Sequence, residues 1–219
     1  MSYEREIVCL AASSRPGGLC YAGKEVQAKT WLRPVGDRAT HEIKPWERLV
    51  GHQPALPGDT VRIPLDRADP KTYQTENHVI SGKPWQRTGH LDYAGLRGYL
   101  DAEQPLWPRE FDTSHGTNDK LRIGTANRQR SSLRLIEVRN LAVIVQDETF
   151  DEPKIGVRAK FTHAAQSYLL RITDPAVRDS YRVRGVGRYD VGRAILCISL
   201  SEELYGYAYK LAAGVFIKP

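Results

Sequence analysis

Short apolar segments, separated by glycine or proline about every ten residues, run through the whole chain, and helical periodicity is scarce. The clearest segment spans 155–162, where apolar side chains alternate with Gly156, Arg158, Lys160 and Thr162. Such alternation predicts a strand with one face in a core and the other toward solvent. The chain is therefore expected to be mostly β, of the barrel or sandwich class.

The predicted strands fall into two groups. In the first part of the chain they lie at about 6–12, 19–27, 30–35, 60–65 and 78–80. In the last part they lie at about 135–145, 155–162, 168–173, 194–200 and 207–217. Because proline cannot donate to a ladder, Pro64 predicts that its strand lies at a sheet edge or ends there.

A short helix is expected between the third and fourth strands of the last group. Asp174 stands at its N-cap, Pro175 occupies its first helical position, and it runs to about Tyr181. Five strands with a helix at that place are the layout of an oligonucleotide/oligosaccharide-binding (OB) barrel. The first group has a comparable strand count without this helix, so we predict two tandem OB-fold-like β-barrels that share topology and little sequence.

The middle of the chain has a different character. Residues 91–101 place Tyr93, Leu96 and Leu100 at helical spacing, which predicts one short amphipathic helix. Residues 110–129 are polar and show no periodicity, which is typical of a long mobile loop or linker. The predicted organisation is a first barrel at 1–90, a helix and loop connector at 91–132, and a second barrel at 133–219.

Composition bounds the environment and the partners. Thirty-two Lys and Arg against 26 Asp and Glu give a net charge of +6 and a pI near 9.2, which is compatible with polyanion binding. The three cysteines are odd in number and far apart, which argues against a disulfide framework and for a reducing compartment. No apolar stretch approaches the roughly twenty residues of a membrane span. We expect a cytoplasmic protein with no membrane association.

The stretch 5–35 contains the spacing of a phosphate-binding loop, GxxxxGK, formed by Gly18 and the pair Gly23-Lys24. That motif needs a Ser or Thr after the lysine and then a helix, whereas Glu25 follows here and the next residues have strand composition. The stretch is therefore predicted to be a hairpin of the first barrel, either purely structural or in contact with phosphate. The candidates for exposed phosphate contacts near its turn are Arg15, Lys24 and Arg33.

A glycine- and arginine-rich segment, 182–193, follows the predicted helix. Its glycines let the backbone follow a phosphate chain, while arginine and tyrosine supply bidentate contacts and a stacking face. We place it at the loop between the fourth and fifth strands of the second barrel, a usual ligand-contacting loop. The alternative is a solvated, mobile loop whose arginines pair with nearby acids. Its candidate nucleic-acid contacts are Arg182, Arg184, Arg188 and Tyr189.

Two strand faces are further candidates. Arg158 and Lys160 occupy outward positions of one strand, and Arg171 lies on its neighbour, so the three would form a basic face if these strands pair. Tyr168 is expected in the core. On the last strand we expect the alternating tyrosines to form a core stripe with hydroxyls at the rim, with a base-stacking platform as the alternative. These tyrosines are Tyr205, Tyr207 and Tyr209.

Metal and catalytic motifs are missing from the sequence. The cysteines and histidines have no C-x-x-C or H-x-x-x-H spacing, so no zinc site and no cofactor are expected. Glu76 and His78 could supply an acid and a base, but no nucleophile is marked nearby. We expect no enzyme, with a hydrolase or nuclease as the alternative.

Five blocks of the chain together resemble a known bacterial family. They read CLAASSRPGGLCYAGKEV, TWLRPV, PGDTVRIPL, YQTENHVI and ILCISLSEELYGYAYKLAAGVFI. In this order they resemble the dual OB-containing domain family over nearly the whole chain. The resemblance implies two OB-like barrels, an association with prokaryotic conflict or defence systems, and nucleic acid as ligand. It implies no catalytic residue.

The sequence thus predicts a nucleic-acid-binding module that uses phosphate contacts and some stacking, with DNA or RNA, single-stranded, as the partner. It would serve a larger defence assembly and meet protein partners there. Two alternatives belong to other classes. One is a sensor that holds a small nucleotide or modified base in a pocket, and the other is a scaffold that binds only proteins.

Overall fold

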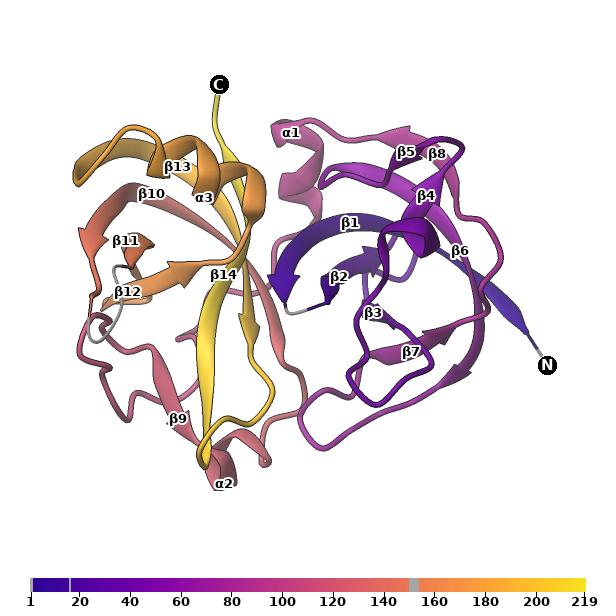
Figure 1. Cartoon of the computed structure of the whole chain (residues 1–219), viewed down its shortest axis with the longest axis horizontal. Helices are drawn as coiled ribbons and strands as arrows, with labels where there is room; N and C mark the ends of the chain where they lie inside the picture. Colours follow the sequence, from indigo (N-terminus) through magenta and orange to yellow (C-terminus); the bar gives the residue numbers. More distant parts are fainter. Residues whose placement is uncertain (1, 16, 150–153) are drawn as a thin grey trace. The chain divides into compact units, whose positions relative to one another are not determined.

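The computed structural model describes residues 2–15, 17–149 and 154–219. The chain divides into two compact units, Met1–Tyr99 and Leu100–Pro219 (Figure 1). Each unit is built on a closed barrel of five strands, and 54% of the chain is strand against 11% helix. The predicted mostly β fold with two OB-like barrels is confirmed.

The first unit closes its barrel in the order β1-β2-β3-β7-β6 and back to β1. All neighbours are antiparallel except β3 and β7, and β8 adds to the outer side of β6. A 3-10 helix, Pro45–Arg48, and the short pair β4 and β5 stand between β3 and β6. The unit ends in α1 (Tyr93–Leu96) and the 3-10 turn η2 (Arg97–Tyr99), where one short helix was predicted. The strands are β1 Tyr3–Arg15, β2 Gly18–Glu25, β3 Trp31–Val35, β4 Leu49–Val50, β5 Gln53–Pro54, β6 Asp59–Ala68, β7 Asn77–Ile80 and β8 Gln86–His90.

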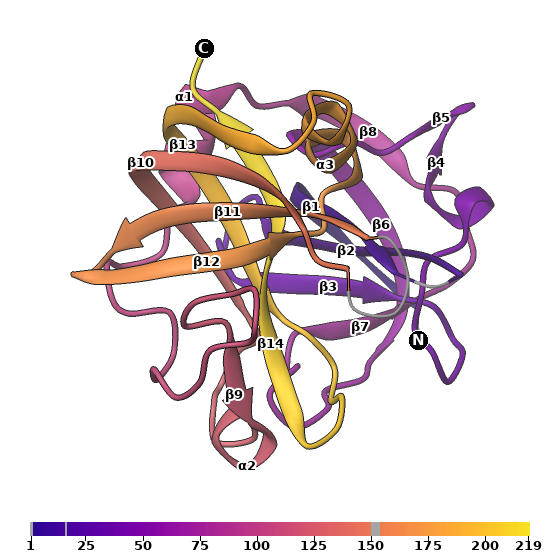
Figure 2. The ribbon, with the colours of Figure 1, turned by 60° about the vertical axis from the view of Figure 1, so that its left-hand side comes forward.

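The second unit repeats this order as β10-β11-β12-β14-β13 and back to β10, again with one parallel pair, β12 and β14 (Figure 2). Helix α3 (Pro175–Arg182) lies between the third and fourth strands as predicted, and the Asp174 side chain caps it by accepting from the Ala176 and Val177 amides. Strand β9 extends the sheet beside β14 and leads into α2 (Ile123–Ala126). The strands are β9 Lys120–Arg122, β10 Leu133–Asp147, β11 Ile155–His163, β12 Gln166–Ile172, β13 Gly187–Leu200 and β14 Tyr207–Ile217.

Pro64 does not mark an edge or an end, so that prediction is wrong. Strand β6 continues past Pro64 to Ala68 and pairs with β1 on one side. On its other side β6 pairs with β8 over residues 59–62 and with β7 over residues 65–68. Pro64 lies between these two ladders, where its carbonyl accepts from the Ser81 amide. The missing N–H therefore falls where β6 changes neighbours, and no ladder bond is lost.

The polar stretch 110–129 is folded, and its interpretation as a mobile linker is wrong. It contains β9 and α2, and Asn118 and Asp119 in its centre are buried. The Thr117 backbone exchanges two hydrogen bonds with Leu169 of β12, while the Asp119 carbonyl accepts from the Lys210 amide of β14. The segment thus fills the seam between the third and fifth barrel strands, a role that leaves no periodic apolar pattern in the sequence.

Strand β14 faces the opposite way from the prediction. Its buried positions near the seam are Ala208, Lys210 and Ala212, so Tyr207 and Tyr209 point outward, and Tyr205 lies before the strand, 88% exposed. The predicted core stripe of tyrosines is therefore wrong, because the lysine takes the inner position.

Lys210 is only 1% exposed, and its ammonium is held inside the barrel. Nζ donates to Asn118 Oδ1 at 2.7 Å and to the Pro108 carbonyl at 3.1 Å. It also lies 5.6 Å from the centroid of the Tyr168 ring, which is buried as predicted. Burial lowers the pKa of Lys210 to about 8, against the opposing effect of Asp119 and Glu110.

The lowered pKa predicts how stability depends on pH. Between pH 8 and 10.5 the unfolded chain holds the Lys210 proton more firmly than the folded one, so the Lys210 contribution to the free energy of unfolding rises with pH in this window. We expect the difference between wild type and Lys210→Met, measured by urea unfolding, to increase by about 3 kcal/mol across it. A difference that stays constant would contradict the buried, perturbed ammonium.

Candidate nucleic-acid interface

Three of the arginines that were predicted to contact nucleic acid form a row across the second barrel. Ile144 of β10 is in register with Arg188 of β13 on one side and with Arg158 of β11 on the other. Arg158 is in register with Arg171 of β12. Residues in register share a face, and Val143 and Val145 occupy the inner one, so the arginines lie on the outer face. Neighbouring strands are about 4.8 Å apart, so this arginine row (Arg188, Arg158 and Arg171) spans roughly 15 Å.

The carboxylate of Glu148 lies within this row. It accepts from Arg158 Nε and, at 3.0 Å, from Arg171 Nη2. Gly156 makes this possible, because a Cβ there would lie 2.0 Å from Glu148 Oε1. Burial raises the pKa of Glu148, but the hydrogen bond from Arg158 and the charges of both arginines outweigh it and hold the pKa below its usual value. Two of the three arginines are thus partly neutralised from within the chain.

The basic face predicted on β11 and β12 is only partly exposed. Arg158 is 6% exposed and has a second carboxylate partner, Asp119 Oδ2, 3.5 Å from Nη1. Its predicted exposure is wrong, because the seam segment and Glu148 cover an outward position of the strand. Arg171 is half-buried, and Lys160 is exposed.

The arginine-rich segment connects α3 to β13. Strand β13 begins at Gly187, earlier than predicted, and the loop between the fourth and fifth strands is 201–206. The predicted location is therefore wrong. Glycine content suggested a loop through 193, but the stretch 187–192 pairs with β10, with a register shift on each side of Leu141.

The turn itself is well built. Gly185 has a φ of +86°, and the Tyr189 hydroxyl donates to the carbonyls of Arg184 and Gly185 at 2.8 and 2.9 Å. The Arg184 guanidinium lies 4.3 Å from the Tyr181 ring centroid, and the Tyr189 ring packs edge-on against Tyr181. Tyr189 therefore positions the turn, and its ring packs against Tyr181 within the protein.

Three arginines of this turn remain on the surface. Arg182 and Arg184 are exposed, and the exposed Arg188 pairs with Asp190 at 2.7 Å. Val183 and Val186 at the tip are 85% and 67% exposed. The region accordingly presents guanidinium groups to solvent on a backbone held by Tyr189.

Two candidates in the first unit, Lys24 and Arg33, are buried, which corrects their predicted exposure. Lys24 is 3% exposed, and its Nζ donates to the Tyr99 carbonyl at 2.7 Å, because the end of the η2 turn covers this part of β2. Arg33 is 8% exposed and lies 3.6 Å from Glu76. The Arg15 side chain lies outside the described residues. The chain continues as strand through Lys24 to Glu25, as the predicted hairpin requires, and no helix begins at the lysine.

The proposed acid and base pair is also engaged elsewhere. Glu76 faces Arg33, and His78 is half-buried with its Nδ1 hydrogen bonded to the Tyr3 hydroxyl. Burial lowers the pKa of His78. Within the described part of the chain, no three His, Cys, Asp or Glu side chains gather as a metal-ligand set, and no helix has the length and apolar character needed to cross a membrane.

A model of the dual OB-containing domain matches residues 5–215. The chain belongs to this family. No curated protein matches its sequence. Among solved structures it is similar to the tetrameric p202 HIN2 domain, with 10% identity, a TM-score of 0.33, and coverage of 99% of this chain and 92% of that one. A likeness that distant carries no functional argument.

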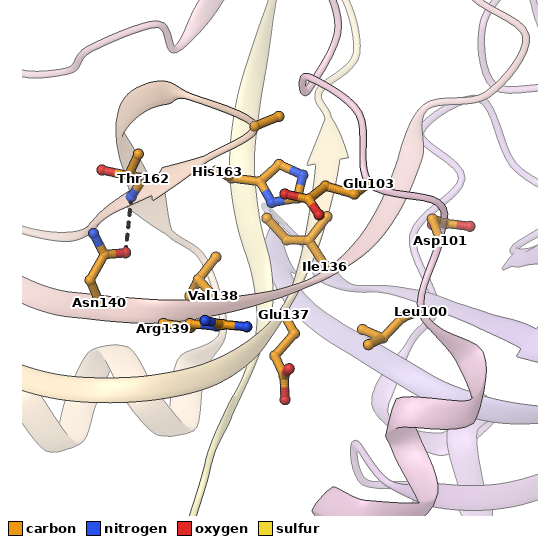
Figure 3. Close-up of a pocket in the computed structure, with 11 residues that line it drawn as sticks. Leu100, Asp101, Glu103, Ile136, Glu137, Val138, Arg139, Asn140, Thr162 and His163 are labelled. Atoms are coloured by element: carbon orange, nitrogen blue, oxygen red, sulfur yellow. Dashed lines mark hydrogen bonds between the residues drawn. The ribbon is translucent and has the colours of Figure 1, made fainter.

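A pocket of about 650 Å³ in the second unit of this dual OB-containing chain lies between β10, the β11 to β12 turn and the segment after Tyr99 (Figure 3). Its charged lining has three carboxyl groups against one guanidinium: Asp101, Glu103, Glu137 and Arg139. His163 also lines it, and burial lowers the pKa of that imidazole. The excess of carboxylates disfavours a phosphate here, so the pocket does not suit an anionic nucleotide.

The Glu148 pairing yields a stability prediction for the dual OB-containing chain. Glu148→Gln leaves the buried Arg158 without its closest negative charge and should lower the free energy of unfolding by about 2 to 3 kcal/mol at neutral pH. A depressed carboxylate pKa stabilises above the unfolded value of 4.5, and this contribution is lost as pH falls below it. Urea unfolding at neutral and at acidic pH should therefore show that the free energies of unfolding of wild type and Glu148→Gln converge in acid. Equal stability at neutral pH would show that the pair contributes nothing.

Proposed function

We propose that this chain is a nucleic-acid-binding module whose phosphate contacts lie on the second unit. The observation that carries the proposal is the group of surface guanidiniums, Arg182, Arg184 and Arg188, on a turn whose backbone Tyr189 fixes. Arginine forks match phosphate oxygens in pairs, and a fixed backbone reduces the entropy lost on binding. The net charge of +6 favours the same class of ligand.

The arginine row supplies a second part of the contact surface. Arg188 belongs to both the row and the turn, so a backbone that follows the turn can continue toward Lys160 and Arg171 on the β11 and β12 face. That face is where OB barrels usually meet oligonucleotides. Arg158 is too buried to touch a ligand and instead orients Glu148 between its neighbours.

The resemblance noted in the sequence also supports a proposal about the biological setting. We propose that the module serves as the recognition part of a prokaryotic defence assembly, with protein partners, in the cytoplasm. The three cysteines are odd in number and far apart in the sequence, which supports a reducing compartment. Co-purification of tagged protein from its native cell, with and without nuclease, would identify partners held directly and those held through nucleic acid.

Binding should depend steeply on salt. Each phosphate contact releases counterions, so raising the salt from about 50 to about 200 mM should weaken binding of an oligonucleotide by at least about tenfold. Fluorescence anisotropy with labelled single-stranded and double-stranded DNA and RNA would measure it. Absence of binding at low salt would refute the proposal.

The turn can be tested by removing its charges together. Arg182→Ala, Arg184→Ala and Arg188→Ala combined should reduce affinity and flatten the salt dependence by about 2 in the slope of log K against log salt, without lowering Tm. A matched control removes three cations from the first unit, through Arg62→Ala, Lys83→Ala and Arg97→Ala. Equal losses in the two triple variants would mean that net charge, not this turn, determines binding.

A further inference from the structure

The loop between the fourth and fifth strands of the second barrel ends in a tight hairpin turn. The Leu204 and Tyr207 backbones exchange hydrogen bonds at 2.8 and 3.1 Å, and the two central residues, Tyr205 and Gly206, have φ angles of +52° and +79°. Positive φ at both central positions defines a type I′ turn, which favours Asn-Gly or Asp-Gly. Here a tyrosine stands where asparagine would fit without strain.

The strained residue does not contribute to the core. Tyr205 is 88% exposed, the largest exposed fraction among the large hydrophobic side chains of the described residues. Side chains other than Gly, Asn and Asp adopt this backbone region at a penalty, and such penalties persist where function requires the side chain. The strained backbone and the exposed ring direct attention to what surrounds Tyr205.

Next to the turn lies a surface of aromatic and cationic side chains. Tyr207 and Tyr209 of β14 are in register with Arg122 and Lys120 of β9, and Phe111 is in register with Lys120 on the other side. Leu121, between the two cations, is fully buried, so these five side chains face outward. We call them the aromatic platform: Phe111, Lys120, Arg122, Tyr207 and Tyr209.

Contacts within the platform hold the rings and cations together. Lys120 Nζ lies 4.2 Å from the Tyr207 ring centroid, and the Arg122 guanidinium lies 5.2 Å from that of Phe111. Phe111 and Tyr207 meet edge to face at 5.9 Å. Tyr205 belongs to the turn that leads directly into β14, two residues before Tyr207. Burial raises the pKa of the Tyr209 phenol, and nearby Asp119, Tyr207 and Tyr205 raise it further.

We propose that Tyr205 and the aromatic platform bind unpaired bases of single-stranded nucleic acid. A base stacks on the exposed Tyr205 ring, its neighbour lies on Tyr207, and Lys120 and Arg122 contact the phosphates between them. Every base has a π-face, so such stacking tolerates many sequences, whereas a duplex keeps its base faces covered. This inference rests on the proposed function and specifies its ligand as single-stranded.

Acidic residues near the turn limit where the phosphates of the bound nucleic acid can lie. Glu110 accepts from the Arg122 amide and the Thr125 hydroxyl, so its carboxylate is turned into the α2 region. Glu202 and Glu203 precede the turn and are exposed. They repel phosphate, which keeps the nucleic-acid backbone on the β9 side and leaves the bases to the tyrosines.

The test removes the ring and keeps the turn. Tyr205→Asn replaces the strained residue by one that favours positive φ, so Tm should stay the same or rise. Its affinity for a fluorescein-labelled oligothymidylate of about 12 nucleotides should fall about tenfold, the effect typical of one lost stacking contact. Tyr205→Phe keeps the stacking face and should bind as the wild type does.

The same assay with a duplex of equal length separates the two proposals. If wild type and Tyr205→Asn bind the oligothymidylate equally well, this inference is overturned and the proposed function stands. Equal tenfold losses for single strand and duplex also overturn it, because stacking would affect only the single strand. Absence of any binding by the wild type overturns both.

A direct readout is photocrosslinking with oligothymidylate that carries 5-iodouracil, followed by mass spectrometry. The expected crosslink falls on Tyr205 or Tyr207. A crosslink confined to the segment 182–189 would contradict the platform while supporting the phosphate-binding turn.

Discussion

The second barrel depends on one buried interaction, the hydrogen bond between Lys210 Nζ and Asn118 Oδ1. Asn118 also donates to Gln166 Oε1 of β12, so one amide joins the third strand to the fifth across the barrel seam. A buried ammonium is tolerated only when its donors are satisfied, and here Asn118 and the Pro108 carbonyl satisfy two of them. The seam segment is therefore as much a part of the barrel as any strand.

That interaction also decides what lies outside. Side chains alternate along a strand, so placing Lys210 inward turns Tyr207 and Tyr209 outward. On hydropathy alone the opposite assignment is the natural one, and the sequence predicted it. The prediction was wrong because the hydrogen-bond partner of Lys210 is distant in sequence. Nothing in the sequence of β14 reveals that Asn118, ninety-two residues away along the chain, accepts from the buried lysine.

The same limit explains which parts of the candidate site could be predicted. Strand positions and the Asp174 cap depend on local pattern, and they agree with the structure within a few residues at most boundaries. Exposure of Lys24, Arg33 and Arg158 depends on segments distant in sequence, which cover each of them. Predicting the arginine row would have required the pairing registers of the strands, including the register shifts between β10 and β13. The alternation of side chains along one β-strand does not contain this information.

The two surfaces of the second unit differ in how their charges are balanced, and this shapes the proposed recognition. In the arginine row, Glu148 partly neutralises Arg158 and Arg171, so a phosphate there competes with a carboxylate and gains less than it does at the turn. At the turn, Arg182 and Arg184 are exposed, so their contacts with phosphate weaken as the salt concentration rises. Stacking on Tyr205 depends less on ionic strength than phosphate contact does. A ligand that needs both must be a polyanion with uncovered bases, which distinguishes a single strand from a duplex without reading its sequence.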